Sequence, residues 1–171
     1  MENTKKSTLA FLLPYAIGLL VIRLVIDTLI KQLELGYNGE SYGSLIALII
    51  EVGIIFVTIN NYKKFQNNNS LHFGEGVKIG VGLLLIMGTL FSMYIFLIHA
   101  KLIDPTYQER LIAEASQKML ENDPNANVDA LTNSKKGDDG TLTGVAFWII
   151  KYIFIGALGG IVSSAILKTE R

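Results

Sequence analysis

The sequence contains no cysteine. This absence excludes disulfide bonds, thiolate zinc sites, iron–sulfur clusters and every thiol–disulfide exchange mechanism, including the quinone-linked disulfide chemistry of some small membrane proteins. Charged residues are also scarce, at 18% of the 171 residues, where a soluble domain would carry about a quarter. Lysine plus arginine equals aspartate plus glutamate at 15 each, so no net charge points to nucleic acid or to an acidic substrate.

Sequence motifs of catalysis are missing too. No nucleophile–base pair stands out, and the glycines of residues 74–80 follow neither the GxGxxG nor the GxxxxGK spacing of phosphate-binding loops. Acidic and amide side chains alternate from Asp123 to Asp129, as in an EF-hand loop. However, Val128 takes the position of the required glycine and Ser134 that of the bidentate glutamate. We therefore expect a protein that is not an enzyme and has no catalytic residues, metal site or cofactor.

Long apolar runs dominate the chain instead, at residues 9–30, 43–61, 76–99 and 143–167. A helix needs about 20 mostly apolar residues to cross a bilayer, a length that the second run barely reaches and the others exceed. SLIALIIEVGIIFVTI lacks the polar face that a soluble helix shows at a period of about 3.6 residues. The pattern predicts an all-α fold, a four-helix transmembrane bundle, as a single integral membrane domain over residues 1–171.

An even number of spans puts both termini on one side of the membrane. Lysine and arginine are denser on that side, in the two terminal segments and the loop at residues 60–70, than in the segments opposite. Because positive charge concentrates in cytoplasmic loops, we expect both termini in the cytoplasm. The protein is then a multi-pass protein of a cell inner membrane, in contact with the lipid bilayer.

The only long segment outside the four runs predicts one amphipathic helix at about residues 105–122 and a flexible loop at 123–141. Asp104–Pro105 is a good helix start, and apolar residues recur every four positions from Tyr107 to Met119. The loop is rich in Asn, Asp and Gly. We expect the apolar stripe to rest on the bundle or on the membrane surface; a partner-binding face is the alternative.

Charged residues interrupt the apolar runs at a similar depth. Taking Lys31, Gly43 and Thr143 as the outer ends of three spans, each of these spans has a charged residue eight positions inside it, or roughly 12 Å below the outer surface. These residues are Arg23, Glu51 and Lys151. Asp27 follows Arg23 by one helical turn on the same face. A charge at mid-membrane costs about 3 kcal/mol and rarely faces lipid. We therefore expect Arg23, Asp27, Glu51 and Lys151 to form a buried charge network inside the bundle.

Two interpretations of this network stay open. In the first, it is a static set of ion pairs that orients the helices. In the second, it is a polar pocket or proton-linked site, with Glu51 as the protonatable group and Arg23 or Lys151 as its modulator. His99, at the outer end of the third run, would either join a proton relay or be incidental.

Small residues give a second packing signal. Gly156, Gly160 and Ser164 recur every four residues in the last run, and Gly80 and Gly88 lie on a comparable stripe of the third. Small side chains let helix backbones approach closely in a membrane. The simplest arrangement packs these two spans against each other, and homodimerisation through the same stripe is the alternative.

Three segments carry a resemblance to a known family: YKKFQNNNSLHFGEGVKIG after the second run, IDPTYQERLIAEASQKM after the third and FIGALGGIVSSAILK in the last. With these segments and the four-run layout, nearly the whole chain resembles the uncharacterised bacterial membrane proteins of domain-of-unknown-function family 4199, of the Bacteroidetes type. The resemblance implies a four-helix multi-pass membrane protein. The family supplies no established activity, so no catalytic residue is carried over.

Two functions follow from these observations. The first is a non-enzymatic subunit or scaffold whose internal charges are architectural, acting as a homodimer or with a membrane-protein partner. The alternative is a small transporter or ion-coupled carrier with a polar site at Arg23, Glu51 and Lys151. The sequence does not identify its small-molecule ligand.

Overall fold

The described part of the chain contains helices and connecting turns, and no strand. The computed structural model describes residues 7–33, 35–129 and 142–169. Its main helices are α1 (Thr8–Gln32), α2 (Gly36–Phe65), α3 (Phe73–Met93), the π-helix η1 (Tyr94–Ile103), α4 (Tyr107–Asn122) and α6 (Leu142–Leu167). Four helical stretches are long and apolar enough to cross a membrane: Thr8–Gln32, Asn38–Phe65, Phe73–Ala100 and Gly144–Leu167. The prediction of an all-α, four-span bundle is therefore confirmed.

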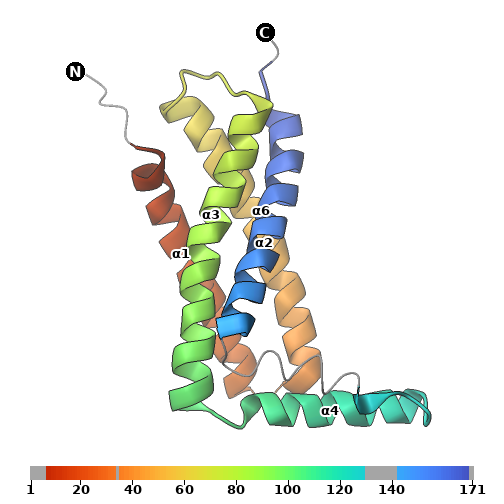
Figure 1. The fold of residues 1–171 in the computed structure, drawn as a ribbon. Coiled ribbons are helices and arrows are strands. Elements are labelled where there is room, and N and C mark those ends of the chain that lie inside the picture. Colours follow the sequence, from red (N-terminus) through yellow and green to blue (C-terminus); the bar gives the residue numbers. More distant parts are fainter. Residues whose placement is uncertain (1–6, 34, 130–141, 170–171) are drawn as a thin grey trace.

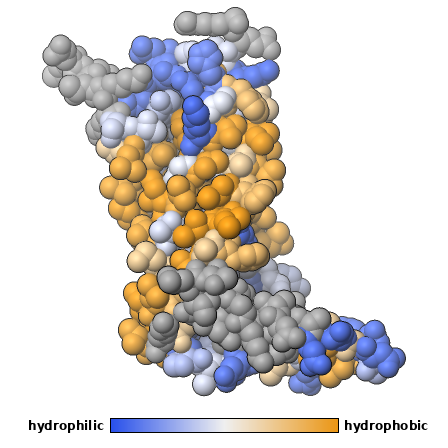
Figure 2. Space-filling model, in the orientation of Figure 1, coloured by the Kyte–Doolittle hydropathy of each residue, from blue (hydrophilic) through white to orange (hydrophobic). Residues whose placement is uncertain are grey.

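The four long helices run side by side along one axis, and α4 lies across that axis at one end of the bundle (Figure 1). The start of α1 and the end of α6 lie at the opposite end. We call these the α4 end and the terminal end. Figure 2 shows apolar side chains covering the visible face of the bundle, with hydrophilic side chains above and below them. This band and the four apolar helices identify a multi-pass membrane protein.

Several helix boundaries differ from those expected. α2 begins at Gly36 rather than near residue 43, because the polar stretch GYNGESY continues the helix beyond the apolar run. The third span continues through η1 to Ile103. α4 begins at Tyr107 rather than at residue 105, because the Thr106 hydroxyl turns back to donate to Asp104 at 3.2 Å. Residues 130–141 of the expected loop lie outside the described residues.

Glycines bring the backbones of α3 and α6 into direct contact. A Cβ atom added to Gly80 would lie 2.6 Å from the carbonyl oxygen of Gly156 and 3.0 Å from the Cα of Gly160. One added to Gly156 would lie 2.7 Å from the Gly80 oxygen. Only a hydrogen atom fits at these positions, as at the small-residue interfaces of other membrane helices. We call this contact the glycine seam.

The glycine seam extends in both directions along α3 and α6. Toward the α4 end, a Cβ atom on Gly88 would lie 2.6 Å from the Cβ of Tyr152. Toward the terminal end, the hydroxyl of Ser164 lies against Gly76 and is fully buried. The small residues of both stripes therefore face each other within one chain, which covers this side of α6.

The terminal end of the bundle is closed. Leu71 is 0% exposed; its amide donates to the Thr169 hydroxyl at 3.3 Å, and its carbonyl accepts from the Thr169 amide at 3.1 Å. Lys63 Nζ donates to the carbonyl of Leu167 at 2.9 Å. Apolar side chains from α1, α2 and α3 fill the adjoining core: Phe11, Leu12, Ala16, Ile55, Ile59, Ile79, Leu83 and Leu84. Among the described residues, the buried carboxylate and guanidinium side chains lie nearer to the α4 end.

Candidate functional site

Three charged side chains are buried in the half of the bundle nearer to α4. Arg23 is 8% exposed, Asp27 7% and Glu51 3%. Arg23 and Asp27 come from one face of α1, and Glu51 comes from α2. Burying a charge is costly unless a nearby group compensates it. What each side chain contacts therefore decides what the site can do.

Asp27 has its partner on its own helix. Lys31 Nζ lies 2.6 Å from Asp27 Oδ2, and the two side chains are 12% and 9% exposed. The same ammonium lies 5.0 Å from the centre of the Tyr107 ring. Asp27 is thus neutralised by Lys31, one turn along α1, rather than by Arg23.

Arg23 makes no ion pair among the residues that the structure describes. Its guanidinium lies 5.1 Å from the centre of the Phe91 ring. Its buried Nε has no hydrogen-bond partner. A desolvated cation–π contact contributes about 2 kcal/mol, whereas burying an ion costs several kcal/mol. Arg23 therefore has no carboxylate within ion-pair distance among the described residues, and its Nε keeps an unused N–H donor inside the bundle.

Lys151 differs from the expectation of a buried side chain. It is exposed on α6, and its ammonium lies 4.6 Å from the centre of the Trp148 ring. The long side chain reaches along α6 to the aromatic face one turn earlier, so its charge need not enter the core. Even so, Lys151 lines the same two cavities as Arg23.

The cavities lie side by side and share Arg23, Ser44 and Lys151 in their walls. The axial cavity has a volume of about 330 Å³ and reaches Tyr107 on α4. The lateral cavity, of about 280 Å³, lies between α2 and α6, and its other lining residues are Leu45, Leu48, Glu51, Tyr152 and Ile155. The structure thus brings Arg23, Glu51 and Lys151 to one cavity, while Asp27 lines only the other.

The charges that line each cavity leave a positive surplus among the described residues. In the lateral cavity Arg23 and Lys151 face the single carboxylate of Glu51. In the axial cavity three cations, of Arg23, Lys31 and Lys151, face two carboxylates, of Asp27 and Glu40. Because Arg23 and Lys151 belong to both walls, the two cavities together are lined by three cations and three carboxylates, and the surplus is local to each wall.

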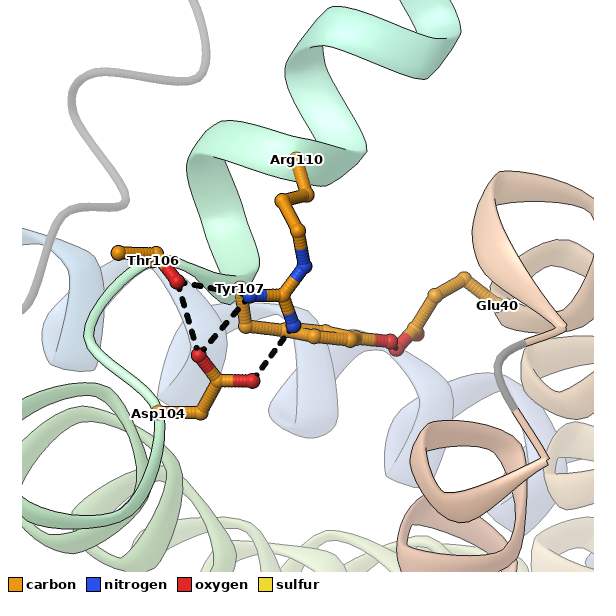
Figure 3. Close-up of polar contacts among 5 residues, drawn as sticks. All are labelled: Glu40, Asp104, Thr106, Tyr107 and Arg110. Carbon is orange, nitrogen blue, oxygen red and sulfur yellow. Dashed lines mark hydrogen bonds and ion pairs between the residues drawn. The ribbon is translucent and has the colours of Figure 1, made fainter.

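Tyr107 forms the α4 side of the axial cavity. Its hydroxyl donates to Glu40 Oε1 at 2.5 Å, and Figure 3 shows the Arg110 guanidinium over its ring. Burial of the ring, followed by the hydrogen bond to Glu40, raises the pKa of the Tyr107 hydroxyl. Tyr107 therefore remains a neutral donor at physiological pH and fastens α4 to α2.

The turn before α4 is fixed by Arg110 (Figure 3). Its terminal nitrogens donate to the two oxygens of Asp104 at 3.2 and 2.6 Å, and one of them also donates to the Thr106 hydroxyl at 2.7 Å. The hydrogen bond from Arg110 is the largest cause that lowers the pKa of Asp104. This cluster sets the direction in which α4 leaves the bundle.

His99 lies in η1 and is 7% exposed. Its ring centre lies 6.2 Å from that of Tyr94 and 5.7 Å from that of Tyr107. It does not appear among the described residues that line the axial or lateral cavity. Its ring thus takes part in the aromatic contact between η1 and α4, and among the described residues no contact links His99 to Glu51.

A comparison with family models identifies the protein family of the chain. The model described as "Protein of unknown function (DUF4199)" matches residues 12–169. The chain belongs to this family. No curated protein and no solved structure matches it. The match covers α4 and the four spans except the first residues of α1, so the cavity residues of this DUF4199 protein lie within the family's shared region.

The site of this DUF4199 protein contains residues that its sequence did not single out. Lys31 seemed to mark a span end, although its spacing from Asp27 is that of a helical ion pair. Trp148 fits an interfacial aromatic, but it lines the axial cavity. Glu40 precedes the apolar run, and Tyr107 belongs to the stripe of α4. No sequence signal joins these two residues, because their contact depends on how α4 crosses the bundle.

Proposed function

We propose that this protein is a non-enzymatic membrane protein that binds a small anion in the cavities around Arg23. The observation that carries the proposal is a buried arginine with no ion pair among the described residues and with an unused N–H donor. A guanidinium is suited to carboxylate or phosphate groups because its planar donors match their oxygens. The bound anion would supply the charge that the chain itself does not bring into contact with Arg23.

The size and lining of the cavities support the same function. Their volumes, about 330 and 280 Å³, are at the lower end of the range for small-molecule sites. Ser44 adds a hydroxyl to both walls. Such a site serves a small transporter or carrier, with Arg23 and Lys151 as anion-binding groups and Glu51 as the group that exchanges a proton.

Orientation follows from charge density. Lys63, Lys64 and Lys168 lie at the terminal end, where Lys63 and Lys64 are in the last turn of α2. By the positive-inside rule this end faces the cytoplasm. In a bacterial inner membrane, the α4 end and the axial cavity then face the outer side.

A subunit or scaffold is the second candidate, and the Asp27–Lys31 contact favours it. This pair is nearly buried and is made within one helix, as expected of charges that are structural. In that case Arg23 would be compensated at longer range by Glu51, and no ligand would be needed.

The proposal is tested by fluorescence of the purified full-length protein in a neutral detergent. Trp148 is the only tryptophan, and it lines the axial cavity. Butyrate and inorganic phosphate are titrated against emission, with butyramide as the neutral control. We expect a saturable change with an anion and none with the amide. Arg23→Gln should weaken the response at least tenfold, whereas Lys64→Gln at the terminal end should leave it unchanged.

Absence of a saturable response to any anion would overturn the proposal, and so would an unchanged response in Arg23→Gln. Lys151→Gln is the second variant, because Lys151 is exposed and its replacement threatens folding less. It should weaken anion binding severalfold.

Glu51→Gln separates the carrier from the scaffold. In a carrier the variant should lose proton-coupled flux in proteoliposomes and keep its fold. In a scaffold it should chiefly lower stability, because two cations lose their nearby carboxylate. A variant with normal flux and normal stability would contradict both roles for Glu51.

A further inference from the structure

The lateral cavity opens toward lipid rather than toward water. Its wall includes Leu45 and Leu48 of α2, which are 55% and 38% exposed. Both residues lie inside the membrane-spanning stretch Asn38–Phe65. Leu48 lies five residues from Gly43, where the apolar run of α2 begins, or about 8 Å along the helix, which is inside a hydrocarbon core about 30 Å thick. The mouth between α2 and α6 is therefore bordered by acyl chains.

The opposite wall of this mouth carries a positive charge at a depth where charges are rare. Lys151 is exposed on α6, within the spanning stretch Gly144–Leu167. Behind it lie Arg23 and Glu51, both buried. A lipid-bordered entrance that is apolar on α2 and cationic on α6 matches the two parts of an amphiphile: its chain fits one and its anionic group the other.

The entrance from the α4 end is less favourable for an anion. Tyr107 closes that side by its hydrogen bond to Glu40, and Lys31 is already paired with Asp27. An anion that approaches along the axis meets these two carboxylates before it reaches Arg23. An anion that approaches between α2 and α6 meets Lys151 first and no described carboxylate other than Glu51.

We infer that the ligand is an amphiphilic anion, a carboxylate or phosphate group on an acyl chain, which enters from the bilayer between α2 and α6. Its anionic group lies at Arg23 and Lys151, and its chain leaves past Leu45 and Leu48 into the lipid. This inference rests on the anion-binding function proposed above, and it adds the chemical class of the ligand and its route.

The experiment uses the full-length protein in neutral detergent and three probes, of which the two long-chain ones are compared at equal mole fraction in the micelle and the third is dissolved in the buffer. They are a dibrominated long-chain fatty acid, the matching dibrominated fatty alcohol, and butyrate as the water-soluble anion. Bromine on the chain quenches Trp148 when the chain is held nearby. We expect saturable quenching by the acid at a concentration at least tenfold below that needed for butyrate. The alcohol should quench weakly and without saturation.

A pair of α2 variants tests the route. Leu48→Phe narrows the mouth and should weaken binding of the fatty acid at least fivefold while leaving butyrate unchanged. Ile49→Phe is the matched control, because Ile49 is 65% exposed and is not among the residues that line the lateral cavity. It should change neither.

The outcomes separate this inference from the proposed function. If butyrate binds and the long chain adds no affinity, the amphiphile is wrong and the anion site stands. Equal effects of the two phenylalanine variants would overturn the lateral route. If neither anion binds, both the inference and the proposed function are wrong.

Discussion

The two ends of the bundle pack the same helices in opposite ways. At the terminal end the glycine seam brings the backbones of α3 and α6 together, and the loop before α3 is bonded to the end of α6. At the α4 end, long charged side chains from α1, α2 and α6 line two cavities. Small residues thus produce a closed half, and charged residues produce an open one. The tight packing of the closed half holds the helices in place. The fold can therefore tolerate buried charges and cavities in the open half, which cost free energy that a well-packed apolar core would not.

The largest expected effect comes from a substitution that disrupts the packing of the closed half. In Gly80→Ala the new methyl group would lie 2.6 Å from a backbone oxygen that cannot move aside by a side-chain rotation. We expect a loss of about 3 kcal/mol in the free energy of unfolding, measured by thermal or denaturant unfolding in detergent. Gly53→Ala is the matched control, because nothing lies within 4 Å of the added Cβ. Equal stability of the two variants would remove the seam as the source of rigidity.

The next effect contrasts two buried charges of the open half. Asp27→Asn breaks an existing ion pair and should lower stability by roughly 3 kcal/mol. Arg23→Met removes a charge that has no ion pair among the described residues, so stability should stay the same or rise by about 1 kcal/mol. Unfolding of both variants without ligand measures the contrast. If Arg23→Met loses as much as Asp27→Asn, Arg23 is structural.

A smaller effect concerns the attachment of α4. Tyr107→Phe removes the hydrogen bond to Glu40, a contact worth about 2 kcal/mol. Hydrogen exchange of the α4 amides should become faster, with little change in the glycine seam. Tyr42→Phe serves as control, because Tyr42 is 70% exposed on the same helix as Glu40. Unchanged exchange in α4 would mean that its apolar stripe alone holds it.

The smallest effect is a pH dependence at the start of α4. The hydrogen bond from Arg110 lowers the pKa of Asp104 below its ordinary value of 3.8 in the folded protein. Its contribution is therefore fully present above that value and is lost as the pH falls through the lower, folded pKa. Asp104→Asn should speed exchange in the first turn of α4 at pH 6 and have a smaller effect at pH 2. Because the Arg110 side chain is 59% exposed, the loss should stay below about 1 kcal/mol. An Asp104→Asn effect of equal size at both pH values would contradict this assignment.

Much of the closed half was predictable from the sequence. Apolar runs of bilayer length fix the four spans, because length and hydropathy are local properties. The glycine spacing of Gly156 and Gly160 indicates a close approach of another helix, although only the structure identifies α3 as that helix. Helix ends were less predictable: α2 extends to Gly36 through polar residues that the hydropathy of the run does not include.

The open half was predictable only in outline. Counting residues brings Arg23, Glu51 and Lys151 to similar depths, and these three line one cavity. The ion pair of Asp27 with Lys31 could be predicted from their spacing. The exposure of Lys151 could not, because the glycine seam sets the rotation of α6 about its axis. Contacts such as Tyr107 with Glu40 join segments 67 residues apart, and no local pattern encodes them.

The most direct test of the anion site is a crystal structure of the full-length protein soaked with 4-bromobenzoate. The bromine of this carboxylate is located by anomalous scattering. We predict a bromine peak in the axial or lateral cavity, with the carboxylate within hydrogen-bond distance of Arg23. The soak uses a concentration that saturates the change in Trp148 fluorescence. Bromine peaks found only outside both cavities would then contradict an anion site at Arg23.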